Sequence, residues 1–168
     1  FTDLSVFDNV AFQMREHTNL PESVIRDLVM MKLEAVGLRG AAGMMPSEMS
    51  GGMARRVALA RTIALDPMLI MYDEPFAGLD PISAAGFDAL TKDLSKSLGL
   101  TVFLITHDLD TLHATCDRVA VLADHKVVAV GTIPELLATD HPWIQAYFNG
   151  PRGRAAQSAV DRHMAKGA

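Results

Sequence analysis

A serine and two glycines stand directly before a predicted helix, in the run Met49-Ser50-Gly51-Gly52-Met53. Glycines let a backbone approach a ligand closely, Ser50 offers a hydroxyl group, and a helix N-terminus presents free N–H groups and the positive end of its dipole. This combination favours an anion, most naturally a phosphate. A flexible loop with a serine cap would contain the same residues, so the run alone leaves both interpretations open.

Two acids follow a short apolar run, Met68-Leu-Ile-Met-Tyr72. Such a run is typical of a strand that is buried on both faces, and α/β sheets bind ligands at the carboxyl ends of their strands. Asp73 is therefore a candidate to hold a hydrated Mg²⁺, which accepts few direct carboxylates. Glu74, the next residue, is expected to point in a different direction from Asp73 and is a candidate base for an attacking water. The alternative is two solvated acids at a strand end.

A histidine follows the next apolar run, in the segment Thr106-His107-Asp108 after residues 101–105. If the two runs form neighbouring strands, His107 lies beside the acids at the end of the first strand and can donate to a phosphate oxygen. Taken alone, a histidine next to a helix cap is usually a polar loop residue.

The predicted elements provide a sheet that could position these candidates. Helices alternate with apolar strands after residue 50, and this alternation predicts a parallel α/β sheet. Asp124-His125 reads as a tight turn between the last two strands. Before residue 50, helices are expected after Ser5, in a capping-box-like start, and between Pro21 and Gly37. The later elements are helices 53–65, 83–98 and 108–116, strands 68–72, 101–105, 118–123 and 126–130, and short helices after Thr132 and around Trp143.

Composition excludes several classes of protein. The 168 residues carry a net charge of −5 without the clustered basic face of a nucleic-acid binder, so no nucleic-acid partner is expected. Arg55, Arg56 and Arg61 fall on one predicted helix and are expected to form a solvated or ion-paired face. Cys116 is the sole cysteine, which excludes an intramolecular disulfide and a cysteine-based zinc cluster. No apolar run approaches the roughly 18 residues of a membrane-spanning helix.

Five short motifs occur in a fixed order: Ser50-Gly-Gly-Met, Leu59-Ala-Arg61, Leu69-Ile-Met-Tyr-Asp73-Glu74-Pro75, Gly78-Leu-Asp80-Pro81 and Thr106-His107-Asp108. Their order and gaps resemble the nucleotide-binding subunit of ABC transporters, from about Ser5 to Gly131. The resemblance implies that Ser50, Gly51 and Gly52 form the signature loop, which contacts the γ-phosphate of ATP held by the opposite subunit. Met53 adjoins this nucleotide site, where the family usually has glutamine, and Met49 replaces the usual leucine.

The resemblance also implies a role for each remaining candidate. Asp73 would be the acid linked to Mg²⁺, through water, and Glu74 the catalytic base. His107 would be the γ-phosphate switch, and Asp80 the loop residue that communicates across a dimer. The implied activity is ATP hydrolysis, with ATP and Mg²⁺ as cofactors.

Three further segments narrow the resemblance: Val6-Phe-Asp-Asn-Val10-Ala-Phe12, Met30–Arg39 and Pro46–Arg56. They look like the ATPases of bacterial Mla/Mce phospholipid-trafficking systems. This implies a homodimer, an integral-membrane permease partner, a small regulatory subunit, and a cytoplasmic position on the inner face of the cell membrane. The alternatives are an ABC-type ATPase of another transport or non-transport system, and a non-catalytic interaction module.

A phosphate-binding loop needs the sequence Gly-Lys-Ser/Thr, and none of the five lysines follows a glycine. We therefore expect an α/β fold that is a partial P-loop NTPase core, with the phosphate loop and its strand upstream of Phe1 and no activity alone. The expected parts are a helical subdomain (1–65), the C-terminal part of a RecA-like ATPase core (66–148) and a polar, flexible tail (149–168). Without that strand, the sheet should be interrupted between strand 101–105 and the hairpin.

Overall fold

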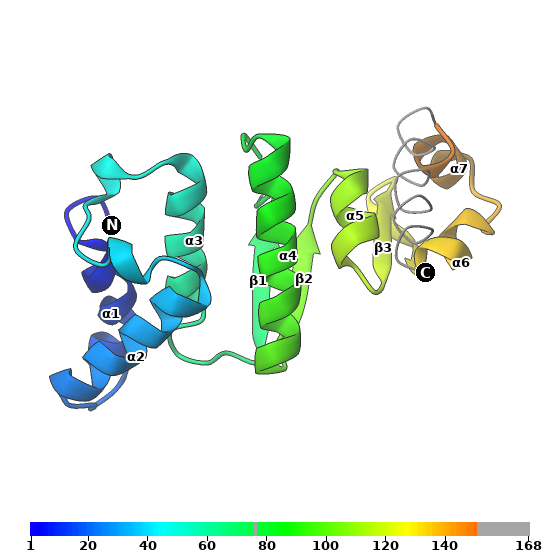
Figure 1. Ribbon diagram of the computed structural model, residues 1–168. Coiled ribbons are helices and arrows are strands. Elements are labelled where there is room, and N and C mark those ends of the chain that lie inside the picture. The colour runs from blue at the N-terminus through cyan, green and yellow to red at the C-terminus, as the bar shows by residue number, and fades with distance from the viewer. Residues whose placement is uncertain (76, 151–168) are drawn as a thin grey trace, which may run out of the picture. The chain divides into compact units, whose positions relative to one another are not determined.

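The computed structural model describes residues 1–75 and 77–150 of the chain. They fall into two units, Phe1–Ile105 and Thr106–Ala168, and the second is described as far as residue 150. The subdomain division at residues 65 and 66 stays a prediction, and most of the predicted tail lies outside the described residues. In chain order (Figure 1), the elements are α1 (Val6–His17), α2 (Glu22–Ala35), η1 (Arg39–Ala41), η2 (Pro46–Glu48), α3 (Gly51–Thr62), β1 (Leu69–Asp73), α4 (Pro81–Leu98), β2 (Thr101–Ile105), α5 (Leu109–Thr115), β3 (Val119–Ala123), β4 (Lys126–Gly131), α6 (Ile133–Leu137) and α7 (Pro142–Phe148).

Helices α1, α2 and α3 build most of the core of the first unit. Ser5 caps α1, as predicted, because its Oγ accepts the N–H of Asp8 at 3.0 Å. Apolar residues recur at helical spacing and place one face of each helix inside. Burying a large apolar side chain contributes about 1.5–3 kcal/mol, so these helices stabilise the unit through their shared cluster. Its members from these three helices are Val6, Val10, Ala11 and Met14 of α1, Ile25, Val29 and Leu33 of α2, and Val57, Leu59 and Ala60 of α3.

Strands β1 and β2 pair in parallel, from Leu69 opposite Thr101 to Asp73 opposite Ile105. This confirms the predicted parallel sheet. Helix α4, which connects the two strands, is capped by Asp80 at its start and ends at Gly99 in the left-handed conformation.

The two faces of this strand pair differ, because side chains alternate along a strand. Ile70 is 2% exposed in the shared core, where α4 contributes Phe87 and Leu94. On the other face, Leu69 and Met71 are 50% and 67% exposed. The prediction of a strand buried on both faces is therefore wrong within the first unit, because none of that unit's described residues covers the second face.

The second unit is built around an antiparallel hairpin of β3 and β4, with Val119 opposite Gly131. Asp124 and His125 both have positive φ angles, 51° and 60°, as a type I′ turn requires. This confirms the predicted turn. The hairpin packs with α5, α6 and α7 around a second cluster of buried residues, which comprises Leu109, Leu112, Val119, Val121, Leu136, Ile144 and Phe148.

The sheet is interrupted after Ile105. Among the described residues β2 pairs with β1 alone, and β3 and β4 form a separate sheet. The expected interruption is therefore present. None of the helices in residues 1–75 and 77–150 has the length and apolar character needed to cross a bilayer.

Lys32 ties α2 to the segment that follows α3. Its ammonium group pairs with the carboxylate of Asp66, and the Lys32 side chain is 10% exposed whereas that of Asp66 is 71% exposed. Asp66 has a left-handed backbone with φ 49°, in the loop that leads into β1. This ion pair therefore helps to fix where β1 begins relative to the helices.

Replacing Asp66 by asparagine should lower the free energy of unfolding of the 168-residue chain by about 1–2 kcal/mol, because the nearly buried Lys32 loses its charged partner. Asparagine keeps the size of the side chain and tolerates a positive φ. Urea unfolding followed by far-ultraviolet circular dichroism measures the change. Glu34→Gln is the matched control, since it removes only the exposed pair with Arg39 at 3.8 Å. Equal losses for both variants would contradict the assignment.

Candidate functional site

The serine–glycine run forms the start of α3. Ser50 is the N-cap, and its Oγ accepts the N–H of Met53 at 3.3 Å, so the helix starts at Gly51, two residues earlier than predicted. The N–H groups of Gly51 and Gly52 belong to the first turn, where helix geometry provides no acceptor. A methyl group added at Gly51 would meet nothing within 4 Å. The fold of the described chain therefore leaves open space at Gly51, where a ligand could approach the backbone.

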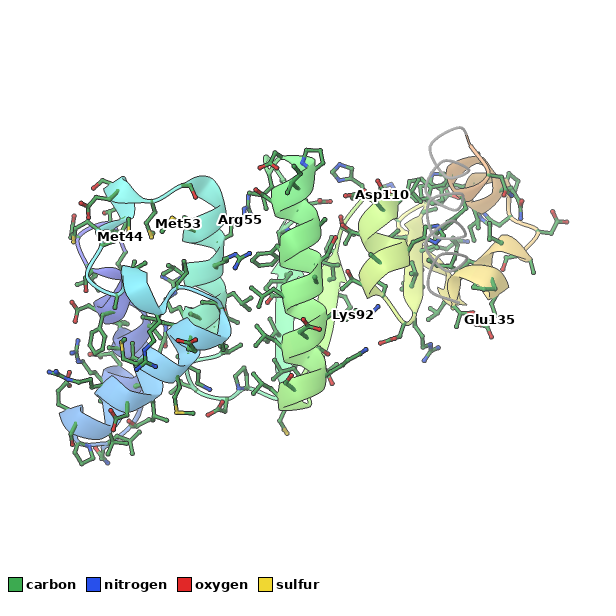
Figure 2. All side chains as sticks on the ribbon, in the orientation of Figure 1. Met44, Met53, Arg55, Lys92, Asp110 and Glu135 are labelled. Atoms are coloured by element: carbon green, nitrogen blue, oxygen red, sulfur yellow. The ribbon has the colours of Figure 1, made fainter. Side chains whose placement is uncertain are left out.

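Met53 contributes packing at this site. Its side chain is half-buried and, like that of Met49, packs against the core cluster of the first unit. Figure 2 labels Met53 on α3 together with Arg55. Met53 thus anchors the start of α3, and its expected place in a nucleotide site stays a prediction.

Arg55 joins the start of α3 to the turn that follows β1. Its Nη2 donates to the carbonyl oxygen of Ala77 at 2.5 Å, and Figure 2 shows Arg55 extending from α3. Nearby, a methyl group added at Gly52 would lie 3.9 Å from the Oγ of Ser83 in α4. The structure therefore brings the serine–glycine run close to the 77–83 segment, which contains Asp80.

The arginines of α3 correct one expectation. Arg56 donates through Nη1 to the carbonyl oxygen of Val36 at 3.2 Å, and the guanidinium of Arg61 lies 5.2 Å from the ring centroid of Phe1. The predicted solvated or ion-paired face is wrong, because these side chains cross to backbone carbonyls and an aromatic ring of other segments. A sequence does not reveal such partners, since every residue carries a carbonyl group.

Asp73 and Glu74 stand at the carboxyl end of β1. Asp73 is exposed, and Glu74 is half-buried. The preceding residue, Tyr72, points into the core, where burial raises the pKa of its phenol to about 12. Alternation along the strand therefore turns Asp73 away from the core.

The backbone of Glu74 is held in an unusual conformation. Its φ is 44°, in the left-handed region that side chains other than glycine and asparagine rarely occupy and that costs roughly 1–2 kcal/mol. The Glu74 N–H donates to the carbonyl oxygen of Ile105 at 2.9 Å, and its own carbonyl accepts the N–H of Ala77 at 3.2 Å. These bonds extend the β1–β2 ladder by one residue and then turn the chain toward the Arg55 contact. Strained residues of this kind cluster at functional sites.

The described residues contain no group of three or more histidines, cysteines, aspartates or glutamates arranged around a metal position. Mg²⁺ typically takes one or two carboxylates and keeps water and phosphate oxygens as its other ligands. A single exposed Asp73 fits that mode. The described residues do not supply a complete set of protein ligands for the ion.

Asp80 caps α4. One carboxylate oxygen accepts the N–H groups of Ile82 and Ser83, each at 3.0 Å, and the other accepts the Ser83 hydroxyl at 2.5 Å. The Ser83 hydroxyl, followed by the backbone N–H groups, holds the pKa of Asp80 below its usual range. Asp80 therefore has a structural role in its own chain, and communication across a dimer stays a prediction.

Removing the Ser83 hydroxyl should raise the pKa of Asp80 toward its ordinary value. A lowered pKa in the folded state contributes stability above the pKa of the unfolded chain, and this is lost as pH falls through the folded pKa. Ser83→Ala should therefore shrink that contribution. Nuclear magnetic resonance of the carboxyl carbon during an acid titration measures the shift. Ser97→Ala, which removes a bond to the Asp93 carbonyl at the other end of α4, should leave the pKa unchanged; an equally unchanged pKa in Ser83→Ala would contradict the assignment.

His107 belongs to the second unit, where it is exposed in the loop before α5. The two strands β1 and β2 are neighbours, as the expectation for His107 required, and Asp73 lies opposite Ile105. The position of His107 beside Asp73 and Glu74 stays a prediction. Within its own unit, the carbonyl oxygen of His107 accepts the hydroxyl of Tyr147 at 2.7 Å, a contact that sequence reasoning did not anticipate.

Comparison with known proteins gives concordant matches. Residues 1–77 match the family described as "ABC transporter". The intermembrane phospholipid transport system ATP-binding protein MlaF of Haemophilus influenzae is 55% identical over 150 residues, which are 89% of this chain and 57% of that protein. MlaF of Escherichia coli K12 is 52% identical over 89% of this chain and 56% of its own length. The probable ribonucleotide transport ATP-binding protein mkl of Mycobacterium tuberculosis H37Rv is 40% identical over 90% of this chain and 42% of its own length.

Among solved structures, cbiO1 from Clostridium perfringens, described as part of the ABC transporter complex cbiONQ, matches with a TM-score of 0.75 and 30% identity. The match covers 94% of this chain and 62% of that one. The chain thus spans about half the length of the curated relatives it matches. The resemblance that the motifs indicate is confirmed: this chain is related to the ATP-binding subunits of ABC transporters.

Proposed function

We propose that the chain is part of the ATP-hydrolysing motor subunit of an ABC transporter. The observation that carries this proposal is Glu74, held in a left-handed backbone at the carboxyl end of β1 and connected through Ala77 to the start of α3. Strained residues cluster at functional sites, α/β sheets bind ligands at the carboxyl ends of their strands, and a carboxylate there can act as a base toward water. The phosphate-binding loop would come from a part of the protein outside these residues.

Each residue would act on the nucleotide in a separate way. ATP with Mg²⁺ supplies the phosphoryl group whose transfer to water releases free energy. Asp73 would orient the hydrated ion, and Glu74 would polarise the attacking water. Ser50, with the N–H groups of Gly51 and Gly52, would bind the terminal phosphate of a nucleotide held by the opposite subunit. His107 would donate to the terminal phosphate of the other nucleotide, at the site of Asp73 and Glu74 in its own subunit. Asp80 and Met53 would position this interface from the same subunit.

The proposed cargo is phospholipid, moved between the membranes of a bacterial envelope. Support comes from the two MlaF relatives, at 55% and 52% identity, whose name states that transport system. The mkl relative, at 40% identity, is named for ribonucleotide transport. The alternative to phospholipid is therefore the cargo of another transport system, such as this one. The higher identity over the same part of the chain favours phospholipid.

The proposed partners are a second copy of the ATPase subunit, an integral-membrane permease and a small regulatory subunit. The ATPase would lie on the cytoplasmic side of the inner membrane, peripheral to it. The segment before Ser50 would carry the permease contact, and exposed apolar side chains on α2 support this. Met31 and Val24 are uncovered there, at 63% and 39% exposure.

In the full-length protein, Glu74→Gln should slow ATP hydrolysis about 10²- to 10⁴-fold and leave ATP binding intact, because the amide keeps the shape of the side chain but cannot act as the base. Single-turnover hydrolysis and equilibrium nucleotide binding measure the two effects separately.

Glu16→Gln on α1 is the matched control, since Glu16 is exposed and the substitution makes the same chemical change away from β1. This control variant should hydrolyse ATP at the normal rate. Normal turnover in Glu74→Gln would remove Glu74 from catalysis. If the unaltered full-length protein neither bound nor hydrolysed ATP, the non-catalytic interaction module would be the better description.

A further inference from the structure

We infer that Tyr147 of α7 is a positioning residue that fixes the backbone of His107. The inference rests on the proposed function, because it concerns how a residue of that site is held. Tyr147 lies 40 positions after His107 in the chain, and its hydroxyl donates to the His107 carbonyl oxygen at 2.7 Å. Both residues belong to the second unit.

The peptide group that joins His107 to Asp108 is held at both of its polar atoms. Tyr147 binds its carbonyl oxygen, and its N–H donates to the Oγ1 of Thr106 at 3.1 Å. Because a peptide group is planar, fixing both atoms fixes the plane and therefore the ψ angle of His107. That angle helps to set where the imidazole side chain is directed.

The following residue is also immobilised. Asp108 is the N-cap of α5, and its Oδ1 accepts the N–H of Asp110 at 3.0 Å. The Asp108 carbonyl accepts the N–H of Leu112 at 3.1 Å, as the first bond of the helix. The loop is thus anchored on the α5 side by its own sequence, and the carbonyl of His107 depends on a distant hydroxyl.

Helix α7 holds Tyr147 in place. Ile144 and Phe148 are buried in the core of the second unit, and the Nε2 of Gln145 donates to the carbonyls of Leu137 and Thr139, each at 2.8 Å. These contacts fix the helix against the end of α6.

The ring of Tyr147 is held from one side by a second aromatic residue. Trp143 stacks on it, with centroids 4.8 Å apart and planes inclined by 12°. Tyr147 and Phe148 also pack edge to face, with centroids 5.2 Å apart. The hydroxyl is therefore presented on a rigid support, which is what a positioning role needs.

The test is Tyr147→Phe in the full-length protein, which removes the hydroxyl and keeps the ring that stacks on Trp143. The free energy of a neutral hydrogen bond corresponds to a factor of about 2–10 in rate, if all of it serves to hold His107 in the reacting geometry. We expect kcat for ATP to fall by about that factor, with the KM for ATP unchanged and the melting temperature lowered no more than in a variant that loses a similar hydrogen bond elsewhere in the same unit.

Thr139→Val is the matched control. It removes a hydroxyl-to-carbonyl bond of the same kind in the same unit, from Thr139 to Glu135 at 3.0 Å, and it should leave kcat unchanged. In the 168-residue chain, the carbonyl carbon resonance of His107 should shift in Tyr147→Phe and stay in place in Thr139→Val.

A double-variant cycle separates this inference from the function it rests on. With His107→Ala as background, Tyr147→Phe should lower the single-turnover rate no further, because Tyr147 acts through His107. If Tyr147→Phe lowered the single-turnover rate by the same factor with His107 and with His107→Ala, the positioning role would be overturned. The same conclusion would follow if Tyr147→Phe turned over ATP normally while His107→Ala was slow. Normal turnover in His107→Ala would instead refute the proposed role of His107 itself.

Discussion

The parallel pairing of β1 with β2 runs from Leu69 opposite Thr101 to Asp73 opposite Ile105, and one further hydrogen bond, from Glu74 to Ile105, closes its end. The direction of the acids and the turn that follows them depend on this ladder. Burial of Ile70 on its inner face fixes which side chains point to the core, so Asp73 is turned outward. The chain then bends at Glu74, whose carbonyl accepts the N–H of Ala77. The positive φ of Glu74 is the consequence of that bend, and the surrounding bonds offset its cost.

Arginines of α3 connect this strand end to the helical part of the unit. Arg55 reaches the turn after Glu74, and Arg56 reaches the carbonyl that ends α2. A guanidinium offers several donors in a fixed plane, so a single helix can bind backbone on two sides. As a result, the serine–glycine run at the start of α3 and the acids at the end of β1 are held by one continuous set of contacts, although 20 or more positions separate them in the sequence.

Local patterns predicted local structure well, because their causes lie within a few residues. The Ser5 cap, the turn at Asp124-His125 and the two parallel strands follow from side-chain chemistry and apolar spacing that the sequence displays directly. The candidate acids and the serine–glycine run were found by the same means. Contacts that join distant segments to backbone carbonyls, such as Arg55 with Ala77 and Tyr147 with His107, have no such signature. The exposed face of β1 was missed for a related reason, since an apolar run does not show which layers are present to cover it.

The central proposal is that the loop at Ser50 would bind a nucleotide whose attacking water would be activated by Glu74 of the other subunit. The most direct test is ATP turnover by mixed dimers of the full-length protein, with Gly51→Asp in one subunit and Glu74→Gln in the other. Aspartate suits the first turn of α3 and has room there, but it repels a phosphate. The account predicts that the dimer of the two variants hydrolyses ATP as fast as a dimer of one wild-type and one Glu74→Gln subunit. In each of these dimers, one of the two sites combines an unaltered loop with an unaltered Glu74. Mixed dimers as inactive as either variant alone, beside an active wild-type pairing, would contradict it.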